Sequence, residues 1–114
     1  MSDSPDDRTR EVLRAHGLPE GLMPAGLSAA EIDADGRFRL SLPKRVEREI
    51  AGYRVRYDTR IEGRLQGAAI EGLKGVDAKQ GLWFGVAAIR EDAGKLAFQV
   101  GPVQVRLSKR HFQA

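Results

Sequence analysis

Few side chains in this sequence have the type and spacing that catalysis or metal binding requires. The only two histidines, His16 and His111, lie near opposite ends of the chain, and neither belongs to an H-x-x-x-H or H-x-H pattern. The sequence has no cysteine, which excludes thiolate metal ligands, disulfides and cysteine nucleophiles. It therefore predicts no metal site and no cofactor. We interpret His16 as a residue at a helix end and His111 as a polar residue of the tail.

The serines give little support to nucleophilic hydrolysis. None of them lies in a G-x-S-x-G pattern, the strained turn that exposes the serine of many esterases. Ser108 precedes His111 by three residues, and in a strand these two side chains would point to opposite faces. We therefore expect a protein that is not an enzyme, and an esterase-like hydrolase is the third of three candidate functions.

Basic residues suggest a second candidate function, the binding of nucleic acid or another polyanion. Residues 1–35 carry eight acidic residues and three arginines, a net charge of −5, whereas residues 36–114 carry sixteen basic and eight acidic residues, a net charge of +8. The aromatic side chains alternate out of phase with the arginines, which makes a poor platform for stacking bases. The same charges also suit a solvated surface that only keeps the protein soluble. The candidate anion contacts are Arg37, Arg39, Arg54, Arg56, Arg60 and Arg64.

An apolar interior suggests the first candidate function, the non-enzymatic binding of an amphiphilic or lipid-like ligand. The stretch LWFGVAAI, residues 82–89, is apolar on both faces and contains glycine and alanine among its larger side chains. Small side chains leave space beside such a strand, and that space suits a ligand cavity. Alternatively, the N-terminal helix and the loop after it fill the space. The candidate ligand contacts are Phe38, Tyr57, Trp83, Phe84, Val86 and Phe98.

The elements that must position these side chains are mostly strands. In YRVRYDTRIEGRL, residues 53–65, charged side chains occupy every even position and mostly apolar ones the odd positions. This period of two predicts an amphipathic strand whose tyrosines face inward and whose arginines face solvent, with Gly63 allowing a bend. GRFRLSL, residues 36–42, alternates in the same way, with one apolar face made of Phe38, Leu40 and Leu42.

The other strands are bounded by turn residues. Residues 28–32 fit either a strand or a single helical turn, and residues 44–52 favour a strand or edge segment although two of their apolar positions have helical spacing. A shift of the apolar positions at Gly101-Pro102 predicts a bulge or a corner. We further expect a short strand over 67–73, a loop over 72–81, a buried central strand over 82–89, a hairpin turn at 91–94, and strands over 96–100 and 103–107.

A short helix and a packed loop precede the strands. Ser4 is a suitable N-cap, Pro5 suits the first helical position, and Gly17 suits the helix stop. The loop GLPEGLMPAGL, residues 17–27, contains prolines and glycines that forbid regular structure, yet it also contains four large apolar residues. A loop this apolar is expected to lie against the body as a lid.

Together these elements predict an all-β, mainly antiparallel barrel or sandwich with a short N-terminal α-helix. The length suits one domain with an acidic leader and helix (1–17), a packed loop (18–27) and a β body (28–114). No apolar run approaches the roughly 20 residues of a membrane-spanning helix, and the acidic N-terminus does not read as a secretory signal. We therefore expect a soluble cytoplasmic protein.

Six segments, in the same order and at similar spacing, resemble a plant family catalogued as domain of unknown function 538. They are HGLPEGLMPAGL (16–27), DGRFRLSLP (35–43), YRVRYDTRIEGRL (53–65), IEGLKGVDAK (70–79), LWFGVAAI (82–89) and LAFQVGPV (96–103).

The resemblance departs at Lys44-Arg45, where members commonly have a cysteine. It implies a small barrel-like domain with an N-terminal helix, similar in shape to half of a tubular lipid-binding domain of the bactericidal permeability-increasing type. It also implies a link to stress responses and roles in binding amphiphiles or hydrolysing chlorophyll esters. It supplies no agreed catalytic residues to transfer to this chain.

Overall fold

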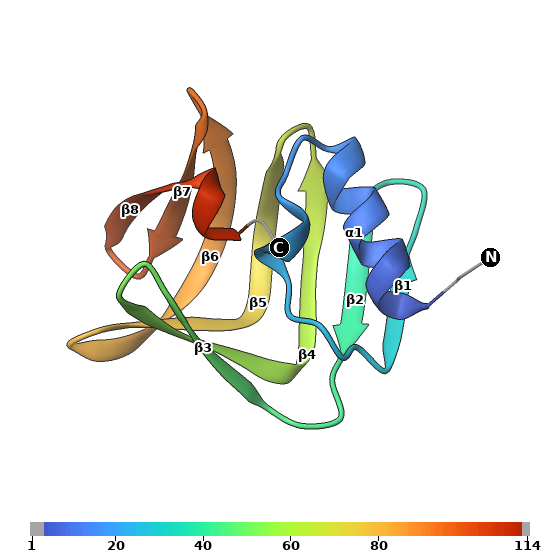
Figure 1. Ribbon diagram of the computed structural model, residues 1–114, viewed down its shortest axis with the longest axis horizontal. Coiled ribbons are helices and arrows are strands. Elements are labelled where there is room, and N and C mark those ends of the chain that lie inside the picture. The colour runs from blue at the N-terminus through green and yellow to red at the C-terminus, as the bar shows by residue number, and fades with distance from the viewer. Residues whose placement is uncertain (1–3, 113–114) are drawn as a thin grey trace.

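The computed structural model describes residues 4–112 and confirms a mainly antiparallel β protein with one short N-terminal α-helix (Figure 1). The elements are, in chain order, α1 (Pro5–Ala15), the 3-10 helix η1 (Glu20–Leu22), β1 (Ala29–Ile32), β2 (Arg37–Ser41), β3 (Val46–Ile50), β4 (Tyr53–Gln66), β5 (Ala69–Gln80), β6 (Leu82–Asp92), β7 (Lys95–Val100), β8 (Val103–Ser108) and the 3-10 helix η2 (Lys109–Phe112). The first three residues of the predicted leader and the last two residues of the chain lie outside this described part.

All eight strands form one open sheet with the order β1-β2-β4-β5-β6-β7-β8, and β3 lies beside the first half of β4. One edge of β4 therefore pairs with two strands, with β3 over residues 53–57 and with β2 over residues 60–64. Within residues 4–112 no pairing joins β8 to β1 or β3, so the sheet is barrel-like without closing into a barrel. Over the described residues, the outer edges of β1, β3 and β8 have no strand partner.

The amphipathic strand predicted from the alternation over residues 53–65 is confirmed as β4. Tyr57 and Leu65 are buried, whereas Arg54 and Arg60 are exposed on the opposite face. The alternation fails at Thr59, which is exposed although its position is odd. The reason is that the register between β4 and β5 shifts between Tyr57 and Glu62, where the strand is irregular.

Gly63 is needed in β4 for close packing. It is the direct partner of Phe38 on β2, and a Cβ at Gly63 would come within 2.8 Å of the Phe38 ring. The register of β4 against β5 also shifts between Glu62 and Arg64, so the irregularity expected at Gly63 is present. A small residue here lets an aromatic ring lie flat across the neighbouring strand.

The loop predicted over residues 72–81 is wrong, because residues 72–80 belong to the long strand β5 and only Gly81 lies outside it. The glycines that suggested a loop instead mark irregular points within the strand. Gly72 and Gly75 have φ of +59° and +91°, and the pairing of β5 with β4 and β6 is interrupted nearby. At Gly75 a Cβ would collide with the carbonyl oxygen of Arg60. Glycine permits this positive φ and this close approach of two backbones.

Two further predictions fail in the last three strands. Residues 82–89 form a strand between β5 and β7, but only one face is buried, and Leu82 is 72% exposed. Gly101-Pro102 is neither a bulge nor a corner but the turn of a hairpin, since Val100 pairs directly with Val103. The apolar positions change parity there because a two-residue turn reverses the chain.

Residues 17–27, expected to have no regular structure, contain the 3-10 helix η1, whereas most other sequence-based elements are confirmed. Residues 29–32 form strand β1 rather than a helical turn, and the segment over 44–52 contains strand β3. Ser4 caps α1 by accepting a hydrogen bond from the Asp7 backbone N–H at 3.1 Å, and Gly17 ends the helix with φ +75°. Over residues 4–112, α1 and the two 3-10 helices all fall short of the length and apolarity needed to traverse a bilayer.

Two different covers lie on the inner face of the sheet. In the first half, which we call the helix-covered half, α1 packs over β1, β2 and the end of β4, and the small void among Leu13, Leu40, Leu65 and Ile70 measures about 10 Å³. The second half, the loop-covered half, comprises β3, the start of β4, the end of β5 and β6–β8, and it lies beneath η1 and η2 (Figure 1).

Candidate functional site

An apolar cavity lies in the interior of the loop-covered half. Its volume is about 40 Å³, little more than the volume of one water molecule in the liquid. It reaches from the two 3-10 helices to the ends of β3 and β8. The lining side chains are Leu22, Met23, Ile50, Tyr53, Val55, Tyr57, Val76, Ala78, Gln80, Val86, Ile89, Phe98, Val100, Val105, Leu107 and Phe112.

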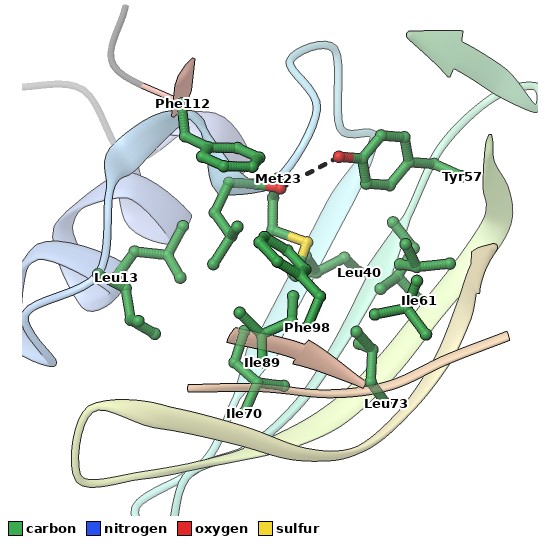
Figure 2. Close-up of a cluster of buried hydrophobic side chains, with 14 of the residues drawn as sticks. Leu13, Met23, Leu40, Tyr57, Ile61, Ile70, Leu73, Ile89, Phe98 and Phe112 are labelled. Atoms are coloured by element: carbon green, nitrogen blue, oxygen red, sulfur yellow. Dashed lines mark hydrogen bonds between the residues drawn. The ribbon is translucent and has the colours of Figure 1, made fainter. Parts of the chain in front are cut away.

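Met23 and Phe112 plug the cavity from the side of the 3-10 helices. Phe112 is only 3% exposed, and its ring stacks on that of Phe98 with 5.4 Å between centroids. Figure 2 shows Met23 in the same cluster of buried side chains as these two rings. The backbone of Phe112 lies so close to Gly21 of η1 that a Cβ at Gly21 would collide with its carbonyl. The two 3-10 helices therefore form one joint cover.

Two side chains from the strands hold this cover in place. Tyr57 donates a hydrogen bond through its hydroxyl to the Leu22 carbonyl at 3.2 Å, the dashed line in Figure 2. Arg48 donates to the Gly21 carbonyl at 2.9 Å, and its guanidinium lies 5.3 Å from the centroid of the Tyr57 ring. Burial raises the pKa of the Tyr57 phenol, and the nearby charge of Arg48 opposes that rise.

Three of the six predicted ligand contacts line the cavity, namely Tyr57, Val86 and Phe98. Phe38 is buried in the other half, where its ring covers Gly63 and borders the small void beneath α1. The alternation on β2 correctly predicts that Phe38 faces inward. It does not say which half of a bent sheet Phe38 occupies.

Trp83 and Phe84 lie outside the cavity. Trp83 is on the outer face of β6, where the Arg56 guanidinium lies 4.2 Å from its ring centroid. Phe84 faces inward and packs against the core, but its ring lies on Gly101, where a Cβ would come within 2.6 Å of it. The alternation of aromatic residues and arginines along one strand did not predict arginine–aromatic stacking. It nevertheless occurs here between strands, because Arg56 on β4 lies over Trp83 on β6.

Several lining residues were not among the sequence-based candidates. Ile50, Tyr53 and Val55 come from β3 and the start of β4, and Phe112 comes from the chain end. The alternation over residues 53–65 was a usable signal for Tyr53 and Val55. For Phe112 the one signal in the sequence was its apolar character, because its position depends on how the C-terminal segment folds back.

The candidate anion contacts are distributed along the outer face, and acidic partners neutralise several of them. Arg56 pairs with Asp77 at 3.2 Å, and Arg39 pairs with Glu62 at 3.9 Å. Arg37 lies opposite Arg64 across β2 and β4 and also pairs with Asp35 at 3.9 Å. Arg54 and Arg60 are exposed and form no ion pair within residues 4–112.

A shallow groove of about 700 Å³ runs beside strands β1, β2, β4 and β5. Its lining contains five basic and four acidic residues, so its net charge is small. A surface that binds phosphates strongly needs an excess of positive charge. The groove's basic residues are Arg8, Arg37, Arg39, Arg64 and Lys74, and its acidic residues are Glu31, Asp33, Glu62 and Glu71.

The polar side chains that could take part in catalysis or metal binding are dispersed over the structure. His111 lies in η2 rather than in a strand, so strand geometry does not govern its relation to Ser108. Ser108 Oγ accepts a hydrogen bond from the Arg110 N–H at 3.5 Å. His16 is the C-cap of α1, as expected, and its Nδ1 donates to the Gly67 carbonyl at 2.7 Å. No cluster within residues 4–112 brings together three His, Asp or Glu residues that suit a metal ion.

The fold and the cavity define a class, a small antiparallel β protein whose bent sheet encloses an apolar space beneath a loop. A comparison with protein-family models matches residues 9–113 to the family described as "Protein of unknown function, DUF538". The chain belongs to this family, which confirms the resemblance seen in the sequence. Searches of curated proteins and of solved structures found no significant match.

Proposed function

We propose that this protein is a non-enzymatic binding domain for an amphiphile with one apolar chain. The observation that supports this most is the apolar cavity covered by η1 and η2 rather than by strands or α1. Its lining offers few polar atoms. Within residues 4–112 no buried side-chain nitrogen or oxygen lacks a hydrogen-bond partner, so the interior presents no unpaired polar atom for catalysis.

The cavity must enlarge to admit such a ligand. Sites for small molecules usually measure about 300–1,000 Å³, far above the 40 Å³ found here. The plug of Met23 and Phe112 occupies the missing space. Both residues are carried by segments that short 3-10 helices and a few side-chain hydrogen bonds hold in place. Their displacement would break no strand pairing, because neither residue belongs to a strand.

The polar end of the ligand would lie near Tyr53 and Gln80. Both line the cavity and are only partly buried, and they belong to the ends of β4 and β5 that are farthest from α1. Their hydroxyl and amide groups can form hydrogen bonds with a carboxyl or hydroxyl head group. The apolar chain would then extend toward Val86 and Phe98.

The test is binding of a long-chain fatty acid in solution, measured by native mass spectrometry and by displacement of cis-parinaric acid. Wild type should bind, and Phe112→Ala should bind at least as tightly because removing the ring opens the cavity. Phe84→Ala is the matched control, since this phenylalanine lies outside the cavity, and it should leave affinity unchanged. Absence of binding in both wild type and Phe112→Ala would contradict the proposal.

The polyanion and esterase candidates have less support. Salt bridges and the mixed charge of the groove reduce the attraction of the arginine rows for phosphates. For hydrolysis, no hydrogen bond between Ser108 and His111 is found within residues 4–112. Steep loss of nucleic-acid affinity with salt, or ester turnover abolished by Ser108→Ala, would support these candidates instead.

A further inference from the structure

The apolar inner face of the sheet continues beyond its cover at one end of the molecule. Leu82 and Val103 are the exposed large hydrophobic residues within residues 4–112, at 72% and 46% exposure. Leu82 is the first residue of β6 and Val103 the first of β8. By alternation they share the inward side with Phe84 on β6 and Val105 on β8.

Strand pairing brings both residues to the same end. The turn between β7 and β8 is fixed to β6, because the Gly101 N–H donates to the Gly85 carbonyl at 3.2 Å and Gly101 packs on the Phe84 ring. Leu82 is two residues from Phe84 on the same strand. Leu82 and Val103 therefore extend from neighbouring hairpins.

A third hairpin turn belongs to this end. Val55 pairs with Ala78, so the turn at Ala51-Gly52 between β3 and β4 lies beside the turn at Gly81 between β5 and β6. All three turns lie on the side of the molecule away from α1 in Figure 1. We call the residues of these three turns, with Leu82 and Val103, the three-turn end.

Exposed cations lie at the same end of the sheet, on its outer face. Arg54 and Lys79 are exposed and have no ion-pair partner within residues 4–112. In the pairing of β3 with β4, the acidic residue Glu49 lies opposite Arg54. Lys79 pairs with the partly buried Trp83, so a cation and an amphipathic ring share one face.

We infer that the three-turn end docks on the surface of a lipid bilayer that contains anionic head groups. Exposed aliphatic residues enter the boundary between head groups and acyl chains, tryptophan favours the same depth, and unpaired cations attract anionic lipids. A single leucine and a single valine give weak, reversible attachment. This docking uses exposed residues alone and goes beyond the proposed ligand binding.

One consequence rests on the proposed function. Tyr53 and Gln80, at the polar end of the cavity, each adjoin a turn of the three-turn end, as do the lining residues Ile50 and Val100. Docking would therefore place the cavity next to the source of its ligand. An amphiphile would pass along the apolar inner face without crossing water.

The experiment is flotation of the full chain with phosphatidylcholine vesicles, with and without phosphatidylserine. Wild type should float with the anionic vesicles and show a blue shift of Trp83, the only tryptophan. Leu82→Asp/Val103→Asp should lower the partition coefficient by about tenfold or more, because each change removes apolar area and adds a negative charge. Arg54→Gln and Lys79→Gln should each lower it roughly fivefold.

The matched control is Ala34→Asp/Ala93→Asp. It adds the same charge at two exposed turns that lie at the opposite ends of their strands, and Ala93 has a φ of +52° that aspartate tolerates. This variant should lose much less vesicle binding than the Leu82→Asp/Val103→Asp variant. Leu82→Ser alone keeps the test valid if the double variant does not fold.

Three outcomes would overturn the inference. They are no flotation of wild type, equal flotation of the two double variants, and a wild-type dimer in light scattering that Leu82→Asp converts to a monomer. Fatty-acid binding without vesicles should be unchanged in Leu82→Asp/Val103→Asp. Loss of flotation with retained fatty-acid binding thus separates docking from the proposed ligand site.

Discussion

The two halves of the sheet bury similar apolar faces under different covers. In the helix-covered half, α1 satisfies its own backbone hydrogen bonds, and Asp6 accepts two more from the Gly26 and Leu27 N–H groups at 2.9 Å. In the loop-covered half, the η1 part of the cover relies on Arg48 and Tyr57. The first cover leaves a void of about 10 Å³ and the second a cavity of about 40 Å³.

This difference indicates where the molecule can open. A helix leaves the sheet only as a unit, whereas η1 and η2 can move after a few hydrogen bonds break. The tight half therefore maintains the fold, and under the proposed function the loose half is the part that would open for a ligand. Three pairs of substitutions test this division, from the largest expected effect to the smallest.

Leu40→Ala should lower the free energy of unfolding by about 4 kcal/mol, because Leu40 is 1% exposed and its neighbours leave no room for the structure to relax. Leu107→Ala makes the same change in the loop-covered half, where Leu107 is partly exposed and borders the cavity. It should cost about 1 kcal/mol. Chemical denaturation measures both, and equal losses would remove the distinction between the halves.

Gly75→Ala should destabilise the protein by about 3 kcal/mol, because φ of +91° strains any other residue and the new Cβ meets the Arg60 carbonyl. Gly72→Ala is the control, with φ of +59° and open space around its Cβ, and should cost about 1 kcal/mol. Thermal unfolding distinguishes the two. Similar losses of stability in the two variants would mean that the close approach of β5 to β4 at Gly75, where the halves meet, is not needed.

Tyr57→Phe should cost about 1 kcal/mol at neutral pH, because the Leu22 carbonyl loses its hydrogen bond. Burial raises the Tyr57 pKa above its ordinary value of 10.0, so the folded state keeps a proton that the unfolded state releases. The stabilisation that comes from keeping this buried phenol protonated is complete below pH 10 and is lost as pH rises through the folded pKa of Tyr57.

Urea titrations at neutral and alkaline pH measure that loss. Wild type should lose more stability between the two conditions than Tyr57→Phe, which lacks the phenol. Tyr53→Phe is the control, because it retains Tyr57, and it should behave like wild type. A Tyr57→Phe variant with the same alkaline loss as wild type would show that the cover does not bury this phenol.

How well the sequence predicted each feature depends on how far apart in the sequence the interacting residues lie. Alternation predicted the inward faces of β2 and β4, and capping residues predicted the start and stop of α1, because side-chain direction and helix capping depend on neighbours a few residues away. The loop over 17–27 was correctly expected to be packed, since four large apolar residues would not stay in water.

Most of the failures involve partners that are distant in sequence; the two-residue hairpin turn at Gly101-Pro102 is a local exception. Gly72 and Gly75 read as loop residues, but β4 and β6 recruit them into a strand. A register shift in β6 between Val86 and Ala88 changes which later residues face inward. The position of Phe112 over Phe98 depends on the whole β7–β8 hairpin and on η1.

The sequence by itself determined that the chain forms amphipathic antiparallel strands behind a short helix, and it indicated the family. Only the tertiary structure decided that the sheet stays open, that half of it lies beneath a loop, and that a small apolar cavity remains there. The physical reason is that period and propensity act along the chain, whereas curvature, register and voids arise when segments far apart in sequence must fill the same volume.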